Sequence, residues 1–231
     1  MTSHYNDPEF VRHYAEGPRA FVPAYAFMQR MAAQLIREGI GERGQVLVLG
    51  AGGGLELEAF IAAAPNWTFV GVDPSEEMLK AAQERVGDAP VAWHHGYVFD
   101  APEGPFDAAT CLLTLHFVED DGSKERTLRE IRRRLMPGAP FILVDLCIDM
   151  AAPSAPRALQ RYRQFALDSG ADCDRVEATC GRVRDVLRTT SAARNEILLA
   201  AAGFVDIELF YAALSWRGWR ASAGVASTAV E

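Results

Sequence analysis

Two patterns of apolar residues alternate along most of the chain. Nearly unbroken apolar runs, such as VLVLG at 46–50 and FILVDL at 141–146, are typical of strands that helices cover on both faces. Between these runs, apolar residues recur every three or four positions, which is typical of helices with one buried face. The patterns predict strands at 46–50, 67–73, 91–96, 107–113 and 140–148, and helices at 54–64, 75–86 and 122–136. This alternation indicates a parallel sheet with helices on both sides.

Further helical and strand patterns flank this alternation. Residues 1–44 carry apolar residues at helical spacing and predict an N-terminal helical cap, and residues 151–190 predict a helical insertion after the fifth strand. A helix at 191–202 and a closing pair of strands at 204–222 follow. We expect three parts, which are a cap at 1–44, an α/β domain at 45–222 that includes the insertion, and a flexible tail at 223–231.

The strongest chemical signal is the glycine-rich segment GAGGG at 50–54, where a strand is predicted to end and a helix to begin. Glycines allow a sharp turn and let the backbone approach a ligand closely. Asp73 ends the next predicted strand, where a carboxylate can accept hydrogen bonds from both hydroxyls of a ribose. A purely structural glycine turn and a helix cap at Asp73 are the alternative interpretations. The combination of loop and acid favours a nucleotide site.

The spacing of these glycines differs from the dinucleotide-binding pattern. Leu55 stands where G-x-G-x-x-G requires its third glycine, so the spacing is G-x-G-x-G. With this loop, the sequence resembles the class I S-adenosylmethionine (SAM)-dependent methyltransferases. Four segments in family order carry the resemblance, namely VLVLGAGGG at 46–54, VGVDPSEEMLKAA at 70–82, FDAATCLLTLHFVED at 106–120 and LREIRRRLMPGAPFILVD at 128–145.

The resemblance implies an α/β fold with a Rossmann-like seven-stranded mixed sheet, whose last two strands form a hairpin, and SAM as the cofactor. The VPAY segment at 22–25 and the C-terminal LFYAALSWRGW look most similar to the carboxy-SAM synthases of the wobble-uridine modification branch and their uncharacterised relatives. Carried over residue by residue, the resemblance places these residues at the cofactor: Tyr25, Gly50, Ala51, Gly52, Gly54, Asp73, Pro74, Met78, Tyr97, Val98 and Leu112. In that pattern the glycines lie under the amino acid end of SAM, Asp73 and Pro74 at the ribose, and Tyr97 and Val98 beside adenine.

Two departures from the family pattern affect the cofactor site. Val48 occupies the position, two residues before the glycine loop, that is usually acidic. This leaves Glu56, Glu58 or backbone carbonyls to contact the ammonium group. Tyr97 occupies the position at which the family has an acidic residue near adenine, and Asp100 is the candidate substitute.

His116 is the candidate catalytic residue, as a general base or a substrate contact. It follows the fourth predicted strand, at the edge of the sheet where ligands bind in open α/β folds. The alternative is a loop histidine that packs on Phe117. A general base typically contributes about 10²–10⁴-fold to a rate, and orientation of the reactants can contribute more, so methyl transfer does not require a base.

Charge and cysteine content narrow the range of partners. The formal net charge of −8 argues against a nucleic acid partner, because proteins usually neutralise nucleic acid phosphates with an excess of Lys and Arg. The four cysteines show no metal-ligand spacing, so no metal is expected. The N-terminus lacks a secretory signal pattern and no apolar run approaches the ~18 residues of a membrane span, which predicts a cytoplasmic protein. Lys124 is expected outside the apolar stripe of the helix predicted at 122–136.

These observations predict a SAM-dependent methyltransferase that acts on a small-molecule acceptor, without a nucleic acid or membrane partner. A carboxy-SAM-forming or tRNA-modification-pathway enzyme and a non-catalytic SAM-binding regulator are the alternatives. The arginine that the carboxy-SAM branch uses for its extra carboxylate has no clear match, since the aligned position is Cys180, with Arg182 and Arg184 nearby. Ordinary SAM is therefore preferred. A nicotinamide dehydrogenase is the weakest rival because the third glycine is missing. The acceptor, the methylated atom and assembly into a homodimer stay open.

Overall fold

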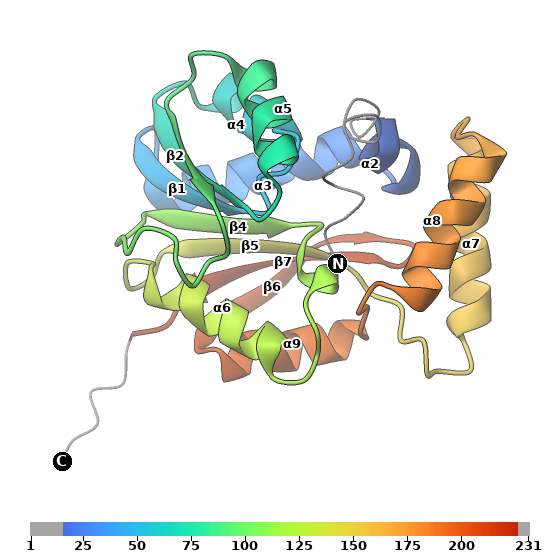
Figure 1. Cartoon of the computed structure of the whole chain (residues 1–231). Coiled ribbons are helices and arrows are strands. Elements are labelled where there is room, and N and C mark those ends of the chain that lie inside the picture. Colours follow the sequence, from blue (N-terminus) through green and yellow to red (C-terminus); the bar gives the residue numbers. More distant parts are fainter. Residues whose placement is uncertain (1–15, 226–231) are drawn as a thin grey trace.

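A seven-stranded sheet with helices on both faces forms the centre of the computed structural model, which describes residues 16–225 (Figure 1). The strands are β1 (Gly44–Leu49), β2 (Trp67–Asp73), β3 (Val91–His95), β4 (Ala108–Leu112), β5 (Pro140–Leu146), β6 (Phe204–Ala213) and β7 (Trp216–Ala223). Their order in the sheet is β3-β2-β1-β4-β5-β7-β6. Strands β1 to β5 pair in parallel, whereas β7 is antiparallel to both β5 and β6. The predicted seven-stranded mixed sheet with a closing hairpin is therefore confirmed.

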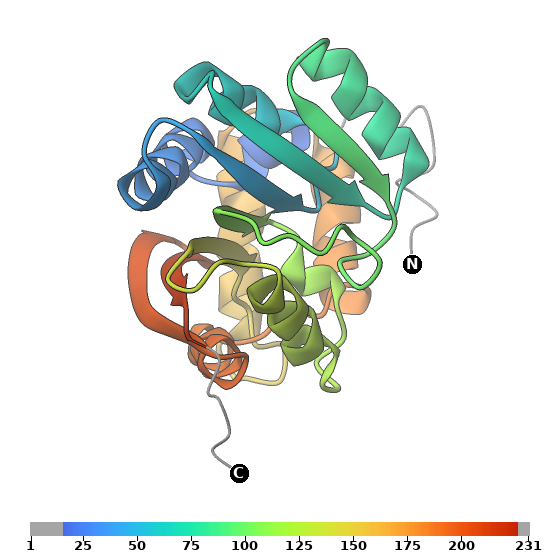
Figure 2. The same cartoon turned by 90° about the vertical axis from the view of Figure 1, so that its left-hand side faces the viewer.

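Helices cover both faces of this sheet. They are α2 (Glu16–Phe21), α3 (Tyr25–Ile40), α4 (Leu55–Ala63), α5 (Glu76–Val86), α6 (Ser123–Arg133), α7 (Ala155–Asp168), α8 (Cys173–Asp185) and α9 (Ala192–Ala201), with a short 3₁₀ helix η2 (Leu115–Phe117) after β4. Figures 1 and 2 show α3, α4 and α5 on one face and α6 and α9 on the other. The pair α7 and α8 stands at one end of the sheet, where α7 packs against α2.

The side chains of β1 explain why its sequence is apolar at successive positions. Val46 and Val48 belong to the buried cluster on the α3 and α4 face, and Leu47 and Leu49 belong to the cluster on the α6 and α9 face. Adjacent residues of a strand point to opposite faces, so a strand between two helix layers buries all of them. Each buried Val or Leu side chain contributes about 1.5–3 kcal/mol to folding.

The helix predicted at 122–136 is shorter than its apolar pattern indicates. α6 ends at Arg133, and residues 134–136 leave the helix to pair with Phe106. The Phe106 backbone N–H donates to Arg134 O over 2.7 Å, and the Met136 N–H donates to Phe106 O over 2.9 Å. Two backbone hydrogen bonds to the segment before β4 thus replace the last helical turn.

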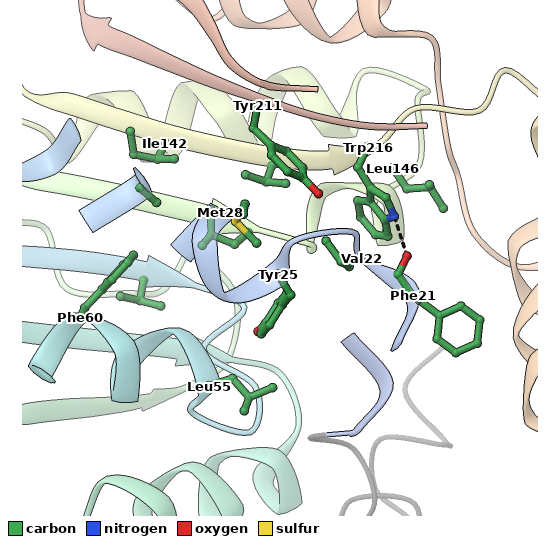
Figure 3. Packing of buried hydrophobic residues seen from close by; sticks show 14 of the residues in the cluster. Phe21, Val22, Tyr25, Met28, Leu55, Phe60, Ile142, Leu146, Tyr211 and Trp216 are labelled. Atoms are coloured by element: carbon green, nitrogen blue, oxygen red, sulfur yellow. Dashed lines mark hydrogen bonds between the residues drawn. The ribbon is translucent and has the colours of Figure 1, made fainter. Parts of the chain in front are cut away.

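The N-terminal helices share their core with the rest of the molecule. Phe21 and Met28 lie in the same buried cluster as the strand residues of that face. Two aromatic side chains of the closing hairpin hold the link between α2 and α3. Tyr211 Oη donates to Pro23 O over 2.6 Å, and Trp216 Nε1 donates to Phe21 O over 3.0 Å, the hydrogen bond drawn in Figure 3. The division into cap, α/β domain and tail stays a prediction; residues 1–15 and 226–231 lie outside the described residues.

Candidate functional site

The glycine turn at 50–54 connects β1 to α4 and needs glycine at several positions. Gly50, Gly52 and Gly54 have φ angles of 76°, 43° and 77°, a region that side chains disfavour. A Cβ atom on Gly50 would lie 2.0 Å from Thr114 Oγ1, so this glycine admits the Thr114 side chain after β4. A Cβ atom on Gly54 would lie 3.0 Å from the Ala82 Cα atom of α5. The turn therefore combines a sharp bend with close packing, and Gly54 serves the approach of α4 to α5.

Asp73 joins the end of β2 to this turn. Its Oδ2 atom accepts a hydrogen bond from Gly52 N, and its Oδ1 atom accepts one from Ser75 N, each over 2.9 Å. Burial raises the pKa of Asp73, and the two backbone N–H groups act against this rise. The cap of α5 is Ser75, whose hydroxyl accepts from Met78 N over 3.2 Å, so helix capping at this position does not fall to Asp73. A carboxylate has about four acceptor sites, so both Asp73 oxygens can accept further donors.

The predicted cofactor residues fall into separate groups. Tyr25, Ala51 and Leu112 belong to one buried cluster, and Figure 3 shows Tyr25 between α3 and the start of α4. Val98 is buried in the cluster on the opposite face of the sheet, so its side chain packs in the core. Tyr97 is 59% exposed.

The remaining predicted cofactor residues and Asp100 lie after β2, in the first turn of α5 and after β3. Met78 is buried in the first turn of α5. Pro74 O lies 3.1 Å from His95 Nε2. Asp100, the candidate substitute near adenine, accepts a hydrogen bond from Tyr97 N over 2.9 Å and lies 3.5 Å from His94 Nε2. The Asp100 carboxylate therefore organises its own loop.

Glu56 is the buried one of the two acidic candidates for the ammonium group. It accepts a hydrogen bond from Thr110 Oγ1 of β4. Burial raises the pKa of Glu56 to about 8, although the Thr110 hydrogen bond acts in the opposite direction. Glu58 instead points outward, 3.5 Å from Arg85, and its side chain is 50% exposed. Val48 is fully buried in the core.

The buried Glu56 carboxyl should make stability depend on pH. Folded Glu56 keeps its proton up to about pH 8, whereas the unfolded carboxyl, with a pKa of 4.5, has lost it. The folded state binds more protons in this window, so the free energy of unfolding falls as pH rises from 5 to 8, by about 1.4 kcal/mol per pH unit. Urea unfolding at several pH values should show this decline in the wild type and a weaker one in Glu56→Gln.

Glu58→Gln is the matched control, because its carboxyl is solvated and its removal should leave the pH dependence unchanged. The raised pKa of Asp73 also makes the free energy of unfolding fall as pH rises, and this contribution is the same in the wild type and in both variants. Equal slopes for the wild type and Glu56→Gln would contradict the protonated state of Glu56.

His116 lies in η2, directly beyond β4, where it forms a pair with a carboxylate. Its Nδ1 atom lies 2.7 Å from Asp145 Oδ1, and its backbone N–H donates to the same oxygen over 3.1 Å. Asp145 is fully buried near the end of β5. Burial alone would raise the pKa of Asp145, but the hydrogen bond from His116, the Lys124 charge and the Asn195 amide lower it overall. The carboxylate is therefore the acceptor, so in the neutral imidazole Nδ1 carries the proton and Nε2 has the lone pair.

His116 packs on aromatic side chains in addition to its pairing with Asp145. Its ring centroid lies 4.7 Å from that of Phe117 and 5.9 Å from that of Trp216. Packing on Phe117 is thus present together with the carboxylate pair. Thr114, two residues earlier, fills the space over Gly50, so the residue that precedes η2 contacts the glycine turn.

Three residues of this site were not predicted from the sequence. Asp145 offered a signal, because it is the charged residue in an otherwise apolar strand, and a buried charge needs a partner. Asn195 of α9 offered none. Lys124 was expected at the surface, which is wrong: it is fully buried, and its Nζ atom donates to Leu115 O over 2.7 Å.

Residues 16–225 hold no group of three or more His, Cys, Asp or Glu side chains that could bind a metal ion. Within the same range, every helix is too short or too polar to cross a bilayer.

The parallel sheet, its antiparallel closing hairpin and the glycine turn beside Asp73 define a nucleotide-binding fold of the class I methyltransferase type. Residues 47–141 match the family model described as a methyltransferase domain. This match covers the part of the chain that carries most of the resemblance to the class I SAM-dependent methyltransferases.

Similar proteins include methyltransferases and a carboxy-S-adenosyl-L-methionine synthase. The chain is 26% identical over 160 residues to a carboxy-S-adenosyl-L-methionine synthase of Staphylococcus epidermidis, covering 69% of this chain and 67% of the relative. It is 28% identical over 159 residues to the O-methyltransferase resE of Aspergillus sclerotiorum, covering 66% and 58%. The structure of human N-acetylserotonin methyltransferase in complex with SAM superimposes with a TM-score of 0.64 at 16% identity, covering 97% of this chain and 59% of the human one. The chain thus spans about three fifths of the length of the last two proteins.

Proposed function

We propose that this chain is a SAM-dependent methyltransferase that transfers a methyl group to a small-molecule acceptor. The observation that carries the proposal is the pair of His116 and Asp145 at the end of β4 and β5, linked through Thr114 to the glycine turn. A histidine that a carboxylate holds in one tautomer, with Nε2 free, is an arrangement suited to general-base catalysis. An acidic chain with such a base fits a small acceptor better than a nucleic acid.

The residues around the glycine turn fit an adenosyl cofactor. Each Asp73 oxygen accepts one backbone hydrogen bond and has capacity for a ribose hydroxyl. Glu56 is the buried carboxyl nearest in sequence to the turn, and we assign it to the ammonium group in place of Val48. The positive charge of a bound ammonium group would favour the ionised form of this carboxyl over the protonated one. When bound, SAM supplies an electrophilic methyl group on a sulfonium. Tyr25, Pro74, Met78, Tyr97, Val98 and Leu112 stay predicted cofactor residues.

The chain's own side chains would then orient the acceptor and take up its proton. His116 Nε2 accepts the proton from the attacking hydroxyl or amine, and Asp145 stabilises the imidazolium that forms. The half-buried Phe117 and the buried Trp216 beside His116 favour exclusion of water from this position.

Replacing Asp73 by Ala should weaken SAM binding by about 10–100-fold. The loss of one hydrogen bond to a charged acceptor, about 1.5–3 kcal/mol, accounts for a change of this size. Isothermal titration calorimetry with SAM measures the effect. Asp88→Ala, at an exposed carboxylate after α5, should bind SAM like the wild type. Equal affinities of the two variants would remove Asp73 from the site, and a wild type that does not bind SAM would overturn the proposed function.

The second candidate function is carboxy-SAM formation, favoured by the similarity to the Staphylococcus epidermidis synthase. Against it, Cys180 takes the place of the expected arginine and is buried in α8. Mass spectrometry of the ligand released from the purified protein separates the two, since carboxy-SAM would support this candidate and SAM or S-adenosylhomocysteine the first. A non-catalytic SAM-binding regulator stays an alternative, which turnover of SAM with any acceptor would dismiss. A homodimer and a cytoplasmic location stay predictions.

A further inference from the structure

Asp145 lies where β5, η2 and α9 meet, and hydrogen bonds occupy both of its oxygens. Oδ1 accepts from the His116 backbone and ring. Oδ2 accepts from Asn195 Nδ2 over 2.9 Å. With donors on both sides, the carboxylate has one orientation, and its charge is shared between η2 and α9.

Asn195 is itself held from two sides. Its Oδ1 atom accepts a hydrogen bond from Thr190 Oγ1 over 3.0 Å, and its Nδ2 atom lies 3.6 Å from Cys147 Sγ. A carboxylate cannot donate, so the amide nitrogen must face Asp145. Asn195 is fully buried, and burial of an amide is costly unless its hydrogen bonds are made. The contacts of Asn195 thus fix the orientation of the Asp145 carboxylate.

Other charged or titratable groups surround Asp145 and Asn195, on each of the elements that pack against these two residues. They are Cys111 of β4, Asp120 before α6, Lys124 of α6, Cys147 after β5, Arg188 before α9 and Arg217 of β7. Burial lowers the pKa of Lys124, although Asp145 acts to raise it. Burial, followed by the Asp145 charge, raises the pKa of Cys147 to about 12, so this thiol stays neutral. Asn195 is therefore the neutral donor on the side of Asp145 away from His116.

We propose that Asn195 is a positioning residue of the methyl-transfer site, which acts through Asp145 to keep His116 protonated on Nδ1 and free to accept a proton on Nε2. The inference rests on the proposed function for the role of His116. Without the Asn195 amide, more of the Asp145 charge falls on His116 and stabilises the imidazolium. His116 would then hold its second proton to higher pH, and less of it would be able to act as a base at neutral pH.

The test is a pH titration of the histidines by ¹³C and ¹⁵N NMR of the full chain. Asn195→Leu keeps the volume and removes the amide donor, and His116→Asn identifies the His116 signal. We expect the midpoint of the His116 titration to rise by about one pH unit in Asn195→Leu. Asn66→Leu makes the same chemical change at an exposed position and should leave the midpoint unchanged. Should Asn195→Leu not fold, Asn195→Ala carries the same expectation.

A His116 midpoint in the Asn195 variant equal to that in Asn66→Leu would overturn the proposal, because a purely structural asparagine alters stability without moving the titration. The readout requires neither SAM nor an acceptor. Its failure is therefore distinguishable from failure of the proposed function, which absence of SAM binding to the wild type would indicate.

Discussion

Replacing His116 by Asn should lower kcat by about 10²–10⁴-fold and leave SAM affinity unchanged. The Asn amide can still donate to Asp145 Oδ1 from the position of Nδ1, so the carboxylate keeps its partner. What the variant loses is Nε2, the atom that would accept the acceptor's proton. The acceptor is first identified by release of S-adenosylhomocysteine in a metabolite screen, and steady-state rates are then compared.

The control for this variant is its own SAM binding, measured by calorimetry alongside its thermal unfolding. Preserved binding with lost turnover separates a role in chemistry from a role in folding. If His116→Asn keeps the wild-type kcat, the pair with Asp145 is structural, and orientation of the acceptor alone accounts for the rate.

Replacing Gly50 by Ala should destabilise the protein by about 2–5 kcal/mol and abolish SAM binding. A side chain in the left-handed region costs about 1–2 kcal/mol, and overpacking costs about 1–3 kcal/mol more. The second contribution arises because the new Cβ atom would lie 2.0 Å from Thr114 Oγ1. Urea unfolding without ligand and calorimetry with SAM measure the two effects.

Gly87→Ala provides the matched control. Gly87 also has a positive φ angle, 58°, but nothing lies within 4 Å of the position of its Cβ atom, so the backbone cost alone remains. Adding Thr114→Gly to Gly50→Ala removes the clash and should restore part of the lost stability, as a double-mutant cycle. Equal costs for Gly50→Ala and Gly87→Ala would contradict the close contact between the glycine turn and the segment after β4.

Local sequence patterns were sufficient to predict the structure where a residue's environment depends on its neighbours in the chain. The strand predicted at 67–73 has the bounds of β2, because the apolar run ends at Asp73, where the chain leaves the sheet. Lys124 shows the limit: its helix places it one turn before Leu128, on the buried side, and a hydrogen bond to Leu115 O makes its burial tolerable. Periodicity treats charge as a mark of the surface and cannot anticipate such a partner.

The partners of His116 could not be predicted, since sheet order brings them together. β4 lies beside β5 with Leu112 opposite Val144, so the chain after β4 meets Asp145. Asn195 reaches the same carboxylate from α9, 50 positions further along the chain. A single sequence without strand order contains no signal for either pairing. The glycine turn and Asp73, by contrast, are joined by one βαβ unit, which the sequence does indicate.

The hydrogen bonds from Tyr211 and Trp216 to the carbonyls of Pro23 and Phe21 have a consequence for biosynthesis. β7 inserts between β5 and β6, yet it is the last strand of the described chain to leave the ribosome. Until it emerges, β5 has an unpaired edge and the α2–α3 link has no anchor. The nascent protein must therefore carry the open edge of β5 while residues 147–215 are synthesised. β7 then completes the fold by closing that edge, and its Trp216 fastens the end of α2 in the same late step.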